Sequence, residues 1–242
     1  MQQIVIVTGA GGWLGHAVAR AFAQAGDNVM LTDINQTSIE QAAATINAES
    51  PGQAALHPAS VSNYAEVQGV VEDTLRRWGR IDVLACVAGG ALGRLTGGRE
   101  KLITEYSTEE WDLVLDSNLK GVFHCIKAVA PPMMERRQGH IIIMGSGTGS
   151  KGRAGWSAYA AAKAGTLGLM KSAALELGEY NVKVNVVAPG KNPHPGEAEM
   201  SAEGNILRRT NEPSEAASFF VQLSRMKGVT GQFLNLDARI LF

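Results

Sequence analysis

The sequence of 242 residues contains only two cysteines and carries a net charge of −1 at pH 7. Cys86 and Cys125 are too few for the disulfide framework of a secreted domain, so we expect a reduced, cytoplasmic protein. The balanced charge provides no basic surface for nucleic acid or for an anionic membrane. No apolar run approaches the roughly 18 residues of a membrane span, and the first residues lack the basic region of a signal peptide.

The sequence also shows no metal-ligand spacing among its five histidines, so we predict no metal site. It has no internal repeat, no low-complexity tract and no linker. Its composition, with 45% hydrophobic and 19% charged residues, is that of a folded globular protein and excludes a disordered chain. We therefore expect one domain that spans residues 1–242.

Short apolar runs alternate with segments of helical periodicity along the whole chain. The expected strands are residues 4–7, 29–31, 81–87, 141–144, 182–187 and 233–236. The expected helices include residues 37–48 and 107–136, which open on capping boxes at Thr37 and Ser107. Pro131 and Pro132 should kink or interrupt the second of these helices. This alternation predicts an α/β fold with a doubly wound parallel sheet in three layers.

Glycine is concentrated in the turn that follows the first expected strand. In a doubly wound fold this turn holds a dinucleotide pyrophosphate, because glycine lets the backbone approach the phosphates and the next helix offers free N–H groups. The position of the motif therefore predicts a Rossmann-type nucleotide site. The residues expected to contact the cofactor here are Gly9, Gly11, Gly12, Trp13, Leu14 and Gly15.

An acidic residue, Asp33, follows the second expected strand. A carboxylate at this place accepts hydrogen bonds from the adenosine ribose and repels a 2′-phosphate. The neighbouring residues Thr32, Ile34 and Asn35 supply no cation for such a phosphate. The sequence therefore predicts NAD(H) rather than NADP(H), whereas the alternative role for Asp33 is to cap a helix.

Tyr159 and Lys163 lie four residues apart on an expected helix and share one face. An ammonium group near a phenol lowers the pKa of the phenol, which makes tyrosine usable as a general acid or base. Ser146 follows the strand at residues 141–144 and can bring a hydroxyl to the same place. These three side chains predict a proton-transfer site.

With these motifs the sequence resembles the short-chain dehydrogenase/reductase family of the single-domain type. The resemblance implies that Tyr159 exchanges a proton with substrate, Lys163 lowers its pKa and holds the nicotinamide ribose, and Ser146 polarises the carbonyl. It also implies that Asn118 supports a proton-relay water. Further cofactor contacts implied by the resemblance are Ser60, Val61, Ala88, Gly89, Pro189 and Gly190. The resemblance further implies a homodimer or homotetramer paired through residues 107–136 and 159–180.

The sequence departs from the family in the glycine turn, where Trp13 replaces the usual middle glycine. The glycine spacing is instead that of longer epimerase-type relatives. An NAD-dependent epimerase or dehydratase, and a non-catalytic nucleotide-binding scaffold, therefore stay open as alternatives. The favoured function is an NAD(H)-dependent oxidoreductase that interconverts a secondary alcohol and a ketone, in the dehydrogenase direction.

Substrate contacts are expected from Arg94, Arg153 and Trp156, together with Ser146 and Tyr159. Arginines can hold a substrate carboxylate or phosphate, although solvated loop charges are the alternative reading. Prolines and glycine near the start of residues 191–209 favour a mobile lid there.

Overall fold

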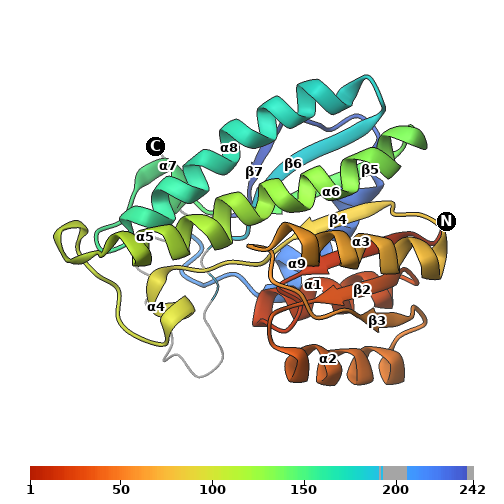
Figure 1. The fold of residues 1–242 in the computed structure, drawn as a ribbon, viewed down its shortest axis with the longest axis horizontal. Coiled ribbons are helices and arrows are strands. Elements are labelled where there is room, and N and C mark those ends of the chain that lie inside the picture. Colours follow the sequence, from red (N-terminus) through yellow and green to blue (C-terminus); the bar gives the residue numbers. More distant parts are fainter. Residues whose placement is uncertain (191, 193–205, 239–242) are drawn as a thin grey trace.

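The computed structural model describes residues 1–190, 192 and 206–238. These residues form a seven-stranded, fully parallel sheet in the order β3-β2-β1-β4-β5-β6-β7, with helices on both faces (Figure 1). The strands are β1 (Ile4–Thr8), β2 (Asn28–Thr32), β3 (Ala54–Leu56), β4 (Val83–Cys86), β5 (Gly139–Met144), β6 (Val182–Ala188) and β7 (Phe233–Asn235). The predicted Rossmann-type, three-layer α/β fold is confirmed.

The helices divide between the two faces of the sheet. One face carries α3 (Tyr64–Trp78), α5 (Thr108–Leu115), α6 (Gly121–Glu135) and α8 (Ser157–Gly178). The other face carries α1 (Trp13–Gln24), α2 (Gln36–Glu49) and α9 (Pro213–Arg225). Two short helices, α4 (Leu92–Thr96) and α7 (Thr148–Lys151), follow β4 and β5 beyond the carboxyl ends of the strands.

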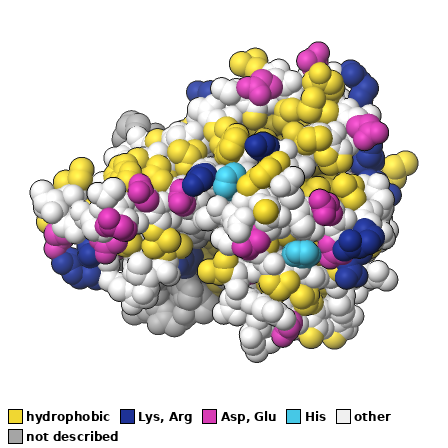
Figure 2. All heavy atoms as spheres, in the orientation of Figure 1, with side chains coloured by type: hydrophobic (Ala, Val, Ile, Leu, Met, Phe, Trp, Pro, Cys, Tyr) yellow, Lys and Arg dark blue, Asp and Glu magenta, His cyan; other side chains and the backbone are white. Residues whose placement is uncertain are grey.

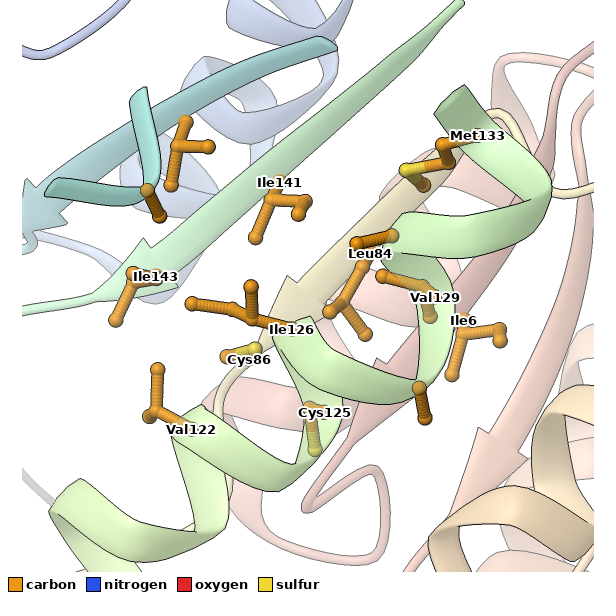
Figure 3. Close-up of a cluster of buried hydrophobic side chains, with 14 of the residues drawn as sticks. Ile6, Leu84, Cys86, Val122, Cys125, Ile126, Val129, Met133, Ile141 and Ile143 are labelled. Carbon is orange, nitrogen blue, oxygen red and sulfur yellow. The ribbon is translucent and has the colours of Figure 1, made fainter. Parts of the chain in front are cut away.

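The continuous apolar runs are explained by burial on both faces of the sheet. In β1, Ile6 packs against one helical layer, while Val5 and Val7 pack against the other. Figure 3 shows the first of these cores, where side chains of α6 meet those of β4 and β5. Cys86 and Cys125 both lie in this core as free, buried cysteines.

Of the two predicted helix caps, one differs from the prediction and one is confirmed. The cap of α2 is Asn35, whose side chain accepts a hydrogen bond from the Ser38 N–H at 3.1 Å, and not Thr37. The capping box at Ser107 is present, since its hydroxyl accepts from the Glu110 N–H at 3.2 Å.

The predicted helix of residues 107–136 is interrupted, but not at its prolines. A π-helical turn at Asp116–Lys120 separates α5 from α6, while Pro131 and Pro132 lie within α6. A π-helical turn carries an extra residue and is frequent at functional sites. The interruption therefore coincides with Asn118, one of the predicted site residues.

The elements that were not predicted include β3, a three-residue edge strand, the short helices α4 and α7, and α9. Most of the predicted lid of residues 191–209 lies outside the described residues. Within the described part of the chain, no helix is long and apolar enough to cross a bilayer.

Candidate active site

The glycine turn lies at the carboxyl end of β1, where the strand order reverses between the paired strands β1 and β4. Doubly wound sheets bind ligands at this place. The Thr8 hydroxyl accepts the N–H groups of Val87 and Ala88, both at 3.1 Å. This hydrogen bonding ties the end of β1 to the segment after β4. The two predicted cofactor segments are thus held side by side.

Three glycines of the turn have no room for a side chain. A Cβ on Gly9, whose φ is +68°, would lie 2.7 Å from Ala88 Cα, and one on Gly15 would overlap the Gly9 carbonyl. A Cβ on Gly11 would lie 2.8 Å from Ser38 Cβ. The backbone here forms a close-packed cradle at the N-terminus of α1, which fits the pyrophosphate of a dinucleotide. Trp13, in place of the usual glycine, is the first residue of α1.

Asp33 lies against this cradle. Its carboxylate accepts hydrogen bonds from the Gly11 N–H at 3.1 Å and from the Asn35 N–H at 3.0 Å. The alternative role of Asp33 as a helix cap is excluded, because Asn35 caps α2. The structure therefore places one negative charge at the rim of the cradle.

The Ser60–Val61 segment is fixed to α6. His124 Nδ1 lies 2.9 Å from the Val61 carbonyl oxygen, which accepts its hydrogen bond. A Cβ on Gly121 would lie only 2.6 Å from Val61 Cγ2. The segment is thus held at the carboxyl edge of the sheet by one hydrogen bond and by close packing.

Asn118 is fully buried in the π-helical turn. Its Nδ2 donates to the carbonyls of Gly90 and Val114, both at 2.9 Å. Its Oδ1 has no partner among the described residues and lies against Gly89, whose φ is +123°. A buried, unpaired acceptor fits a site that is completed by another molecule.

Ser146, Tyr159 and Lys163 come together at the carboxyl end of β5. The Ser146 hydroxyl accepts from the Thr148 N–H at 3.1 Å and also hydrogen-bonds the Tyr159 phenol. Lys163, 4% exposed, donates from Nζ to the Met144 carbonyl at 2.9 Å. Its Nζ lies 5.5 Å from the centroid of the Tyr159 ring.

The electrostatics of this group differ from the expectation. Burial raises the pKa of Tyr159, an effect that the Ser146 hydrogen bond and the positive charge of Arg94 oppose. Burial also lowers the pKa of Lys163 to about 8. The cation that lowers the pKa of the phenol is Arg94. The Lys163 ammonium instead donates its hydrogen bond to the Met144 carbonyl.

The remaining predicted substrate residues surround the phenol. The Trp156 and Tyr159 rings meet edge to face with centroids 5.5 Å apart, and the Arg153 guanidinium lies 4.1 Å from the Trp156 ring centroid.

The predicted cofactor residues Pro189 and Gly190 directly follow β6, and the Pro189 carbonyl accepts a hydrogen bond from Asn192 Nδ2 at 2.7 Å. The described residues hold no group of three or more acidic, histidine or cysteine side chains that could bind a metal.

Sequence reasoning missed two residues that shape the site. Thr8 joins the end of β1 to the segment after β4. Its position at the end of the first expected strand could have indicated this role. His124 lies six residues after Asn118, and no local pattern connects it to Val61. The link from His124 to residue 61 could be found only from the fold.

The chain is similar to known proteins along nearly its whole length. Residues 3–201 match the family described as short chain dehydrogenase. The chain is 34% identical over 248 residues to the 3-oxoacyl-[acyl-carrier-protein] reductase FabG of Thermotoga maritima, with 99% of this chain and 98% of that protein covered. A 3-oxoacyl-[acyl-carrier-protein] reductase of Synechocystis is 35% identical over 242 residues, which covers 97% of this chain and 95% of that protein. A solved structure of a 3-oxoacyl-[acyl-carrier protein] reductase with bound NAD, from Brucella melitensis, matches at a TM-score of 0.89 and 29% identity, with 99% of this chain and 91% of that chain covered.

Proposed function

Because the chain belongs to the short-chain dehydrogenase family and is an oxidoreductase, we propose that it interconverts a ketone and a secondary alcohol with NAD(H). Tyr159 acts as the general acid and base in this proposal. The observation that carries it is the meeting of Ser146, Tyr159 and Lys163 at the carboxyl end of β5. This group lies two strands from the glycine cradle of β1.

The side chains of the site have separate tasks in this proposal. The Tyr159 phenol gives its proton to the ketone oxygen in reduction and takes it back in oxidation. The Ser146 hydroxyl holds the same oxygen and hydrogen-bonds the phenol. Lys163 supplies a positive charge near the ring, and Asn118 adds a buried polar group beside Gly89 and Gly90. A bound nicotinamide supplies or accepts the hydride.

The choice of NAD(H) rests on the charge of Asp33. The carboxylate lies at the cradle, bonded to the Gly11 N–H, where it would repel a 2′-phosphate. The Brucella melitensis relative was solved with NAD bound, which supports this choice. Cofactor residues are the cradle of Gly9, Gly11, Gly12 and Gly15, with Asp33 at its rim.

A second candidate is the reduction of a 3-oxoacyl thioester. The names of the relatives favour it, since matches in Thermotoga maritima and Synechocystis are both 3-oxoacyl-[acyl-carrier-protein] reductases. It uses the same residues and the reductive direction, opposite to the dehydrogenase direction expected from the sequence. A cytoplasmic location is part of both candidates.

The test is turnover of purified protein with a panel of ketones and alcohols, including 3-oxoacyl thioesters, followed by the absorbance of reduced nicotinamide with each cofactor. We expect activity with NAD(H) and a loss in Tyr159→Phe of about 10²- to 10⁴-fold in kcat, the usual contribution of a placed proton donor. NADH binding, measured by fluorescence, stays unchanged in this variant.

Tyr180→Phe is the matched control, because Tyr180 lies beyond the end of α8, with its ring 5.9 Å from the Arg137 guanidinium. It keeps full activity. Wild-type turnover in Tyr159→Phe would contradict the proposed role of the phenol, and NADH binding without any turnover on the panel would support the scaffold alternative.

A further inference from the structure

One arginine whose charge acts on the proposed proton donor has no hydrogen-bond or ion-pair partner among the described residues. Within the described residues Arg94, on α4, makes no ion pair and no hydrogen bond, while the next two cations along the chain are paired. Arg99 bonds Glu105 at 2.5 Å, and Lys101 bonds Glu110 at 2.5 Å. The absence of a carboxylate partner is thus particular to Arg94 in this segment.

The side chain of Arg94 is held over the backbone of Gly90. A Cβ on Gly90 would lie 2.9 Å from Arg94 Cδ and 3.1 Å from its Cγ, so the aliphatic stem packs directly on this glycine. The Gly90 carbonyl in turn accepts from Asn118 Nδ2 at 2.9 Å. Arg94 is an exposed residue, and its stem rests on the same scaffold that carries Asn118, one of the site residues.

The charge of Arg94 acts on the reacting group. Its guanidinium lowers the pKa of the Tyr159 phenol, although burial raises that pKa overall. Arg153 covers the face of Trp156, and the Trp156 ring meets the Tyr159 ring edge to face. Arg153 also lacks an ion pair among the described residues, but its guanidinium already stacks on the indole of Trp156. Arg94 is the better placed of the two to bind an anion near the phenol.

We propose that Arg94 binds a carboxylate of the substrate, so that the enzyme acts on oxo acids and hydroxy acids whose carboxylate lies close to the reacting carbon. A guanidinium has only donors and matches the two oxygens of a carboxylate, which makes such hydrogen bonds strong and directional. With the substrate oxygen at Ser146 and Tyr159, the substrate carboxylate would be the acidic partner that the described residues do not give to Arg94. This inference rests on the proposed function.

The experiment compares pairs of substrates that differ only in charge, such as 3-oxobutanoate and its methyl ester, with other oxo acids and their esters. We expect wild type to prefer the acid, and Arg94→Gln to raise KM for the acid by about 10- to 100-fold, as for loss of a hydrogen bond to a charged group. KM for the ester stays nearly constant. Arg99→Gln, the matched control, changes neither KM, because Arg99 is paired with Glu105.

The readout is KM, since loss of the Arg94 charge also raises the pKa of the phenol and so alters kcat and its pH profile for both substrates alike. An equal rise of KM for acid and ester would overturn the inference and leave the proposed function intact. No turnover of any ketone by wild type would instead defeat the proposed function. The variant could instead show a raised KM only for a 3-oxoacyl coenzyme A thioester, with KM for the matching N-acetylcysteamine thioester unchanged. That result would assign Arg94 to a phosphate of the substrate and overturn the carboxylate assignment.

Discussion

At the scale of single residues, the types and spacing of the site residues were readable from the sequence, but the direction of each side chain was not. Tyr159 and Lys163 lie one helical turn apart, as expected for residues four positions apart. The Lys163 ammonium nevertheless bonds the Met144 carbonyl, which belongs to a strand that the sequence cannot place beside it. The effect of Arg94 on the phenol depends in the same way on tertiary structure, because 65 positions separate the two residues in the chain.

Asp33 allows a direct test of cofactor choice at a single residue. Asp33→Asn keeps an acceptor for the Gly11 N–H, which donates to Oδ2 at 3.1 Å, and removes the negative charge. We expect the Kd of NADH to rise about tenfold, because hydrogen bonds to charged groups are stronger than those to neutral ones. The Kd of NADPH should fall, since the repulsion of its 2′-phosphate is lost.

Fluorescence titration with both cofactors measures the two constants, and a thermal melt establishes that the variant is folded. An unchanged ratio of the two constants would show that Asp33 does not select the cofactor. Ile34→Arg, at an exposed neighbour, serves as the complementary variant, because an added cation should strengthen NADPH binding alone.

At the scale of elements, periodicity predicted most strands and helices, but local signals misplaced one interruption. Pro131 and Pro132 indicated a break, yet they lie within the last turns of α6. The break comes at Asn118, where the backbone widens into a π-helical turn and the amide bonds the carbonyls of Gly90 and Val114. No residue type in that segment predicts a π-helical turn, because Gly90, which accepts a hydrogen bond from Asn118, is distant in sequence. The edge strand β3 is too short to show periodicity.

Gly15 carries a prediction about the junction of β1 and α1. A Cβ at this position overlaps the Gly9 carbonyl, so Gly15→Ala must push the turn apart. We expect a loss of about 1–3 kcal/mol in the free energy of unfolding, the usual cost of overpacking, together with weak NADH binding. Urea unfolding and fluorescence titration measure the two effects.

Gly69→Ala is the comparison for that change. Gly69 lies within α3, and its added Cβ would meet the His57 Nε2 atom, the far end of a side chain, at 3.3 Å. NADH binding should be unchanged there. If Gly15→Ala bound NADH as tightly as wild type, the close-packed turn would not be part of the cofactor site.

At the scale of the whole molecule, the order of elements was enough to predict a doubly wound parallel sheet, since alternating strands and helices admit few other packings. The predicted homodimer or homotetramer stays a prediction. Its proposed faces do carry exposed apolar side chains: Leu113, Phe123 and Leu175, on α5, α6 and α8. Figure 2 shows hydrophobic side chains spread over the face on which these helices lie. The predicted lid of residues 191–209 also stays a prediction, because most of it lies outside the described residues.

The stability of the whole fold should depend on pH through His140, which lies in β5 and is 2% exposed. Burial, helped by the charge of Lys183, lowers the pKa of His140 to about 4 from 6.5. The Nδ2 donor of Asn185 lies 2.8 Å from His140 Nε2, and Asn185 cannot turn its amide without losing hydrogen bonds to Val229 and Gln232. Protonation of the ring would therefore set an N–H donor at His140 Nε2 against the Nδ2 donor of Asn185.

The lowered pKa of His140 determines how the stability of the fold changes with pH. Between pH 6.5 and 4 the unfolded chain binds a proton at His140 that the folded protein does not, so stability is full above pH 6.5 and falls as the pH is lowered. The loss should reach about 3 kcal/mol by pH 4, at 1.36 kcal/mol per pKa unit. Urea unfolding of wild type and of His140→Gln across this range measures it, because other titrating groups cancel in the difference. We expect the variant to be less stable at pH 7 and the gap to narrow steadily towards pH 4; a gap independent of pH would show that His140 is not the group that titrates.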